Sequence, residues 1–248
     1  EVTFIPYKPL VRKEDLVLPY DINDCVIPYT SINLGRHLRS YYGSYLDEEA
    51  LKFHNYYSTL KIPSEYWLNG DFIITTFYDF ELNYKRFYAM FDTDELFIRP
   101  NSGSKLFTGL PLHGADDLLS QLNALRQLSG VVDSSLIIVS KVKEIIDEFR
   151  FVIAGNNILD GSQYKWYDMP TYRHFYTDDA YKLAKMVANC EETPVDVFTC
   201  DIATMKDGSV KIIELNSFNC AGWYACDPIT IIKGVSEFVQ RSYDELNE

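Results

Sequence analysis

Three oxygen-bearing side chains stand close together toward the C-terminal end of the chain: Asp201, Glu214 and Asn216. They fall on two β-rich runs that flank the turn residues Lys206–Gly208, and an Asp-Gly pair between such runs favours a β-hairpin. Since side chains alternate between the faces of a strand, Glu214 and Asn216 share a face, and the partner strand can bring Asp201 beside them. Two carboxylates and an amide oxygen suit Mg²⁺, which completes its octahedron with water and substrate phosphates. The spacing therefore predicts a metal site, against the alternative of a merely solvated acidic hairpin.

A second polar segment supplies the cations that a phosphate-bearing substrate needs. The β-rich residues Leu96–Arg99 run into a polar loop with one glycine, and Lys105 and Gly109 follow. Backbone N–H groups in such a loop can surround phosphate oxygens, and the charges of Arg99 and Lys105 can neutralise them. Polar loops after strands are common, so this segment alone is weak evidence. Together with the acidic hairpin it predicts a nucleotide site.

Composition and charge narrow the class of protein. The 248 residues are 47% hydrophobic and 24% charged, which is ordinary for a soluble globular protein. A net charge of −13 argues against a nucleic-acid backbone as partner, because such binders present basic faces, but it leaves ATP open. Five cysteines without a Cys-x-x-Cys pair indicate reduced thiols rather than a disulfide framework. No apolar run reaches membrane-spanning length, so we expect a cytoplasmic protein without a membrane partner.

The periodicity of apolar residues predicts two units that meet near residue 94. Residues 1–94 are expected to form a small α/β unit, with strands at 25–29 and 71–77 and helices at about 31–42, 46–60 and 83–91. Residues 95–248 are expected to add strands at 96–99, 136–142, 148–154, 158–164, 195–203 and 210–215, with helices at 116–128, 178–190 and 228–241. This order predicts α+β layers rather than a strictly alternating parallel sheet.

The combination of the basic loop with the acidic hairpin resembles the ATP-grasp superfamily. In that family a basic residue on a strand, a proline and a mobile glycine loop cover the ATP phosphates, and an Asp and a Glu-x-Asn on adjacent strands hold magnesium. The run Phe97–Pro100, the Lys-x-Phe-x-Gly residues at 105–109 and Glu148-Phe149-Arg150 resemble, more narrowly, a bacterial and phage clade marked by two arginines and one lysine. The resemblance implies an ATP-grasp domain at 95–248, with two α+β subdomains that grip ATP, after a small α/β pre-ATP-grasp domain at 1–94.

The resemblance also implies roles for individual residues. Three cations, Arg99, Lys105 and Arg150, would act in catalysis, the first two by binding phosphates and Arg150 by binding the γ-phosphate or an acyl phosphate. The adenine edge would be read by the linker Val139, Ser140, Lys141 and Val142, and the ribose hydroxyls by Glu148. Asp201, Glu214 and Asn216 would be the metal ligands. One departure is Thr199, where many relatives carry an arginine, and Arg150 would supply the missing charge.

Other residues are less strongly marked. Relatives often place the acceptor substrate at the position of Asn219–Tyr224, and the cations Lys165, Arg173 and His174 could meet that substrate. Phe107 and Tyr164 are expected in the core.

The activity implied is that of an ATP- and Mg²⁺-dependent carboxylate–amine ligase, which forms an amide or peptide bond through an acyl phosphate and releases ADP. Its partners would be a small-molecule carboxylate and amine. A peptide or protein terminus as acceptor and a homodimer both stay open. Two other functions also stay open: a catalytically silent ATP-grasp-like binding protein, and a phosphotransferase that stops at phosphoryl transfer.

Overall fold

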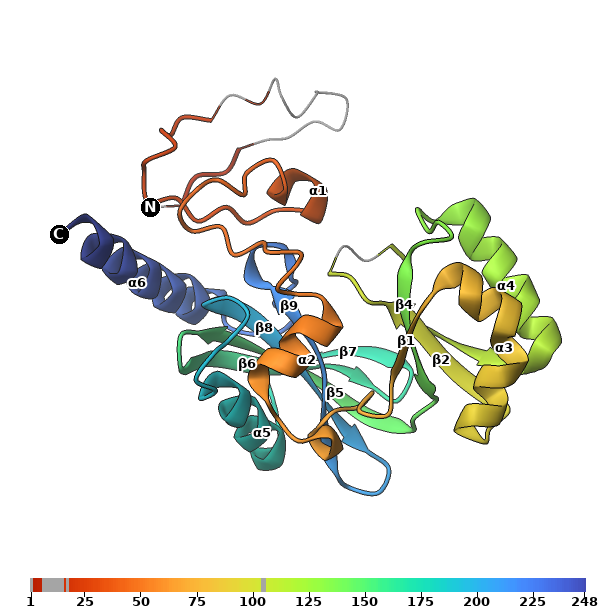
Figure 1. The fold of residues 1–248 in the computed structure, drawn as a ribbon. Helices are drawn as coiled ribbons and strands as arrows, with labels where there is room; N and C mark the ends of the chain where they lie inside the picture. Colours follow the sequence, from red (N-terminus) through yellow and green to blue (C-terminus); the bar gives the residue numbers. More distant parts are fainter. Residues whose placement is uncertain (1, 6–15, 17, 104–105) are drawn as a thin grey trace.

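Two antiparallel sheets, each covered by helices, make up the fold (Figure 1). The computed structural model describes residues 2–5, 16, 18–103 and 106–248. We call the four-stranded sheet, with strand order β1-β4-β2-β3, the small sheet, and the five-stranded sheet, with order β7-β6-β5-β8-β9, the large sheet. Every strand pairing in either sheet is antiparallel, which agrees with the expected α+β layers.

The small sheet carries two helices on one face. Its strands are β1 (Ile73–Thr76), β2 (Glu95–Pro100), β3 (Leu110–His113) and β4 (Leu136–Lys141). Helices α3 (Phe77–Phe91) and α4 (Gly114–Leu128) bury apolar side chains against β2 and β4 in one continuous core. The Thr76 hydroxyl accepts the N–H of Asp79 and caps α3, so this helix starts earlier than the expected residue 83.

The large sheet is buried on both faces. Its strands are β5 (Ile145–Ala154), β6 (Asn157–Trp166), β7 (Met169–Arg173), β8 (Val197–Met205) and β9 (Val210–Ser217). Alternate residues of β5 face opposite layers: Phe151 and Ile153 pack with α5 (Asp178–Ala188), whereas Val152 and Ala154 pack with α6 (Pro228–Asn247). The expected hairpins and the helices capped at Thr177 and starting at Pro228 are therefore confirmed.

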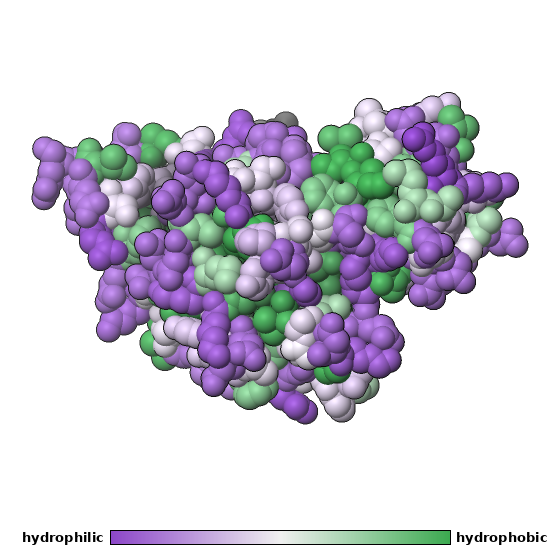
Figure 2. Space-filling model, turned by 60° about the horizontal axis from the view of Figure 1, so that its bottom comes forward, coloured by the Kyte–Doolittle hydropathy of each residue, from purple (hydrophilic) through white to green (hydrophobic). Residues whose placement is uncertain are grey.

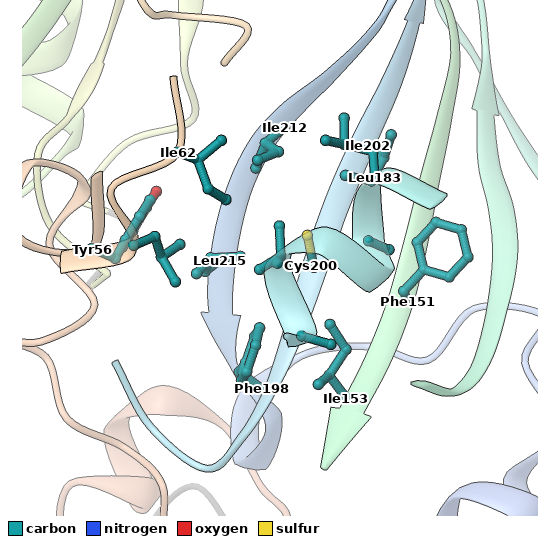
Figure 3. Packing of buried hydrophobic residues seen from close by; sticks show 14 of the residues in the cluster. Tyr56, Ile62, Phe151, Ile153, Leu183, Phe198, Cys200, Ile202, Ile212 and Leu215 are labelled. Carbon is teal, nitrogen blue, oxygen red and sulfur yellow. The ribbon is translucent and has the colours of Figure 1, made fainter. Parts of the chain in front are cut away.

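The N-terminal segment packs on the large sheet. It contains α1 (Ile32–Gly35), α2 (Phe53–Leu60) and the 3-10 turn η2 (Ser64–Tyr66). Tyr56 of α2 and Ile62 after it lie in the same cluster as Leu215 of β9 and Leu183 of α5 (Figure 3). This segment therefore shares its core with the sheet that carries the predicted metal ligands.

Three expected N-terminal elements are wrong. Residues 25–29, all of which the structure describes, contain no strand, and the backbone carbonyl of Pro28 accepts a bond from the Asn219 side chain instead. The helix expected to reach residue 42 ends at Gly35. The helix expected from residue 46 begins at Phe53, because the Asp47 carboxylate accepts two following backbone N–H groups and fixes a turn.

The predicted unit boundary near residue 94 falls between α3 and β2. Strand β1 pairs with β4, with Ile73 opposite Val139, and α3 shares a core with α4. Residues 73–91 and 95–141 therefore form one layer. A division into domains at 1–94 and 95–248 stays a prediction.

Hydrophilic residues cover most of the face drawn in Figure 2, and apolar residues gather there in separate patches. Among the described residues, no helix is both long and apolar enough to cross a membrane. Helix α6, with 20 residues, is instead amphipathic, since Ile231, Val235 and Val239 bury one stripe of it against the large sheet.

Candidate nucleotide and metal site

The β8–β9 hairpin brings two of the predicted metal ligands together. The strand register sets Asp201 opposite Glu214 and Thr199 opposite Asn216. The turn is closed by a bond from the Met205 N–H to the Ser209 carbonyl at 2.8 Å, and Gly208 there has a φ of +83°, which glycine adopts at little steric cost. The hairpin that the Asp-Gly pair predicted is confirmed.

Asp201 pairs with Arg150, its neighbour across β5 and β8. Arg150 Nε lies 2.7 Å from Asp201 Oδ1 and Nη2 lies 2.6 Å from Oδ2, a two-pronged arrangement, while Nη1 donates to the carbonyl of Gly222 at 3.1 Å. The side chains are only 4% and 2% exposed. Burial lowers the pKa of Arg150, but the adjacent charge of Asp201 raises it further, and the net shift is upward. The buried guanidinium therefore stays charged.

Glu214 pairs with Arg99, which reaches it from the other sheet. Arg99 Nη2 on β2 lies 2.5 Å from Glu214 Oε2 on β9, and Nη1 donates to the carbonyl of Ile213 at 3.3 Å. Asn216 Nδ2 donates to Glu214 Oε1 at 3.0 Å, so all three predicted metal ligands lie in one neighbourhood of the two arginines. Burial lowers the pKa of Arg99, and the charge of Glu214 more than offsets that effect.

Glu148 joins the same network through Tyr164. Its Oε2 accepts the Tyr164 hydroxyl at 2.6 Å, and its Oε1 lies 3.0 Å from Lys165 Nζ. The Tyr164 hydroxyl also lies 3.5 Å from Asp201 Oδ2. Burial, with the charges of Asp201 and Glu148, raises the pKa of Tyr164, so the phenol remains a hydrogen-bond donor.

A cleft of about 810 Å³ lies between the sheets and is lined by residues of both. Arg99 and Glu214 form part of its wall, together with Glu148 and the consecutive residues Lys141 and Val142 at the end of β4. Cavities of a few hundred to a thousand Å³ hold ligands the size of a nucleotide. The cleft therefore brings five of the predicted site residues to one ligand-sized space.

The other predicted nucleotide-binding residues have different surroundings. Val139 is fully buried and has strand partners on both sides, Ile73 and Ile98. Ser140 is also buried, and its hydroxyl donates to Asn69 Oδ1 at 2.9 Å. Lys105 lies outside the described residues. An adenine contact at 139–142 stays a prediction, which the lining of the cleft supports at Lys141 and Val142.

Aromatic residues beside the network are what the sequence analysis missed. Tyr164 and Phe107, expected in the core, also line the cleft. The ring of Tyr224 stacks on Tyr164 with centroids 4.6 Å apart, and the Arg150 guanidinium lies 4.9 Å from the Tyr224 centroid. The expected pairing of 148–154 with 158–164 was the available signal for Tyr164, since it places that residue near Glu148. No comparable signal marks Tyr224, which lies in a loop.

The segment expected to meet an acceptor substrate is divided in role. Asn219 is buried, and its Nδ2 donates to the carbonyls of Pro28 at 2.6 Å and Gly43 at 3.0 Å, so it attaches the N-terminal segment. Tyr224 instead covers Arg150. Among the cations expected there, His174 Nε2 lies 2.9 Å from Asp160 Oδ1, away from the cleft lining.

The donor set can be tested against the chemistry of Mg²⁺. Asp201, Glu214 and Asn216 offer two carboxylates and one amide on adjacent strands. In the part of the chain that the structure describes, no group of three His, Cys, Asp or Glu side chains is gathered closely enough to hold a metal ion. The set therefore suits an ion that keeps water and phosphate ligands, as Mg²⁺ does, rather than one enclosed entirely by protein.

Comparison with known structures supports the fold. The D-cycloserine synthetase DcsG is similar with a TM-score of 0.56 and 14% identity, over 80% of this chain and 71% of that one. A D-alanine–D-alanine ligase from Bacillus anthracis complexed with ATP gives a TM-score of 0.52 and 15% identity, over 78% and 66% of the two chains. The ATP-grasp ligase PsnB, complexed with precursor peptide PsnA2 and AMPPNP, gives 0.50 and 12%, over 78% and 60%. At these identities the likeness shows the fold alone.

No curated protein matches the sequence. A family model does match, over residues 55–235, and it describes the ATP-grasp domain of family 3 in the clade named for two arginines and one lysine. The match covers most of the chain, including both arginine–carboxylate pairs and the cleft between the sheets. The chain has the ATP-grasp fold and belongs to family 3 of this clade of ATP-grasp domains.

Proposed function

We propose that this protein is an ATP- and Mg²⁺-dependent carboxylate–amine ligase that forms an amide or peptide bond and releases ADP. In the proposed reaction, a substrate carboxylate takes the γ-phosphoryl group of ATP and becomes an acyl phosphate. The amine nitrogen then bonds to the acyl carbon as orthophosphate leaves. The observation that carries the proposal is the pair of arginine–carboxylate contacts, Arg99–Glu214 and Arg150–Asp201, beside a cleft of nucleotide size.

The roles of the residues follow from charge and position. Arg99 lines the cleft and can transfer its hydrogen bonds from Glu214 to phosphate oxygens. Arg150 can do the same beside Asp201, where the developing charge of the acyl phosphate would need a buried cation. Bound Mg²⁺, with Asp201, Glu214 and Asn216 as its protein ligands, would neutralise the phosphate groups. Lys105 remains a third cation predicted from the sequence.

Positioning of the nucleotide would fall to residues of both sheets. Lys141 and Val142 support an adenine contact at the end of β4, and Glu148 supports a contact to the ribose hydroxyls, since all three line the cleft. The Tyr164 hydroxyl and Lys165 hold the two oxygens of Glu148 in place. Because no described side chain is needed as a covalent nucleophile, we expect catalysis by positioning and electrostatics.

The experiment that tests the proposal is calorimetric titration with ATP, with and without Mg²⁺. We expect Mg²⁺-dependent binding by the wild type and its loss in Asp201→Asn/Glu214→Gln, which removes both charges but keeps the shape of the side chains. The control is Asp179→Asn/Glu237→Gln, which removes two exposed carboxylates outside the cleft lining. Equal binding by the two double variants would refute the nucleotide and metal assignment, provided that circular dichroism shows both to be folded.

Product analysis then tests the reaction. Wild-type protein given ATP, Mg²⁺ and a carboxylate–amine pair that stimulates ADP release should yield orthophosphate and an amide. A stable phosphorylated product instead would identify a phosphotransferase. ATP binding without ADP release from any tested pair would favour a catalytically silent binding protein.

A further inference from the structure

A small cavity lies outside the large cleft, where the N-terminal segment meets the end of β9. Its volume is about 20 Å³, which is room for one water molecule or a group the size of a methyl. Ile32, Leu46 and Leu51 form the wall on the N-terminal side, and Asn216 and Ala221 contribute to the wall on the other side. One charged residue, Glu48, is also part of the lining.

The N-terminal wall is firmly attached. Besides its bonds to Pro28 and Gly43, the Asn219 side chain accepts the N–H of Tyr45 at 2.6 Å, and its backbone carbonyl accepts the N–H of Thr30 at 2.8 Å. The Tyr29 hydroxyl donates to the carbonyl of Ala221 at 2.6 Å. These bonds fix the cavity on both sides, so it is a built feature of the fold.

The cavity and the cleft are neighbours along β9. Asn216 borders the cavity, and its Nδ2 donates to Glu214, which lines the cleft. A group held in the cavity would therefore lie next to the predicted metal and phosphate site. In the proposed reaction, that is the place from which an amine must approach the acyl phosphate.

The chemistry of the lining selects the ligand. The walls are largely apolar, and the carboxylate of Glu48 is held by Arg36, with Nε 3.0 Å and 3.1 Å from its two oxygens. A carboxylate has about four lone-pair sites, so Glu48 can accept further hydrogen bonds while Arg36 fixes its direction. The Glu48 side chain is 35% exposed, which leaves it open to an incoming cation.

We propose that this cavity binds the amine substrate as a primary ammonium ion on Glu48, with a short apolar substituent between Ile32, Leu46 and Leu51. The inference rests on the proposed function and adds a substrate class to it. The wall residues 32–51 precede the family-matched residues 55–235, so the specificity comes from a part of the chain that family membership does not determine.

The test uses ligand-observed NMR on the whole chain in the presence of Mg–AMPPNP, with ethylamine, propionate and phenethylamine as probes. We expect ethylamine to bind, because it carries the cation and a short apolar group, and the other two not to bind. Glu48→Gln should raise the dissociation constant of ethylamine about tenfold or more, since it removes a charge-assisted bond. Leu46→Phe, which fills the cavity, should abolish the binding.

The matched control is Glu49→Gln, because Glu49 is more exposed and pairs with Lys52 outside the cavity lining. It should leave ethylamine binding within about twofold of the wild type. Failure of the wild type to bind ethylamine, or equal binding of propionate, would overturn the inference. So would unchanged ethylamine binding in both Glu48→Gln and Leu46→Phe. Calorimetry with Mg–AMPPNP keeps the cases apart, since only loss of nucleotide binding by the wild type contradicts the proposed function itself.

Discussion

At the scale of single residues, the centre of the site is a balance of charge. Asp201 and Glu214 each bond to one arginine, and the four side chains lie between 2% and 20% exposed. Buried carboxylates are costly unless a partner compensates them, and the same holds for buried guanidinium groups. Each arginine therefore keeps its carboxylate ionised, and each carboxylate is ready to exchange an arginine for a metal ion.

This balance predicts unequal costs for removing the two arginines. Arg150→Met should lower the free energy of unfolding by about 3–5 kcal/mol, because Asp201 would stay deeply buried without its arginine. Arg99→Met should cost less, since the Glu214 side chain is 20% exposed and water can reach it. Urea unfolding measures both changes.

Lys182→Met serves as the control, because it breaks an exposed pair with Asp179 and should shift the free energy by less than about 1 kcal/mol. A cost for Arg150→Met no larger than that of the control would contradict the argument from burial.

At the scale of elements, local patterns predicted much of the fold and contacts between sheets did not follow from them. The hairpin of Asp201 and Glu214 was predictable because the turn lies between them in the chain, and the helix after Thr177 because its cap is local. The Arg99–Glu214 pair joins residues 115 positions apart on different sheets, which no local pattern encodes. The N-terminal errors have the same origin, since Asn219 rather than a neighbouring strand satisfies the backbone there.

Two hairpin turns permit a matched prediction. Gly208 and Gly155 both have positive φ, +83° and +54°, so alanine at either should cost about 1–2 kcal/mol for the left-handed conformation. A Cβ at Gly208 would meet nothing described within 4 Å, whereas one at Gly155 would lie 2.7 Å from Cε2 of Phe238 on α6. Gly155→Ala should therefore cost about 1–3 kcal/mol more than Gly208→Ala in urea unfolding.

Adding Phe238→Leu should recover part of the cost of Gly155→Ala if contact with α6 causes it. Equal costs for the two alanine variants would show that the turn conformation, rather than packing against α6, dominates.

Attachment of the N-terminal segment depends on one side chain. Asn219→Ala removes the bonds to Pro28, Gly43 and Tyr45 and leaves buried backbone groups without partners, at about 1–3 kcal/mol each. Hydrogen exchange should accelerate at Tyr45 and Thr30, while amides of α5 on the far side of the large sheet keep their protection. Uniform acceleration over the whole chain would mean that Asn219 stabilises the fold globally rather than this attachment.

At the scale of the whole molecule, the two sheets are separate layers that meet at the cleft. The Arg99–Glu214 pair bridges them, and residues of both sheets line the space between. The chain carries a net charge of −13, yet two buried guanidinium groups lie at this junction. A polyanion would therefore be attracted by local cations rather than by the overall field.

A ligand that contacts both layers should stabilise the molecule as a unit. Mg–AMPPNP at about 100 times its dissociation constant should add about 2.7 kcal/mol to the free energy of unfolding. For a chain of this size, that gain corresponds to a rise in Tm of about 5–11 °C, which differential scanning calorimetry can measure. Asp201→Asn/Glu214→Gln should lose most of the rise, because the metal no longer links the phosphates to β8 and β9. Hydrogen exchange should slow at both β2 and β9 in the wild type. Protection confined to one sheet would contradict a nucleotide site between the layers, even if the Tm rises.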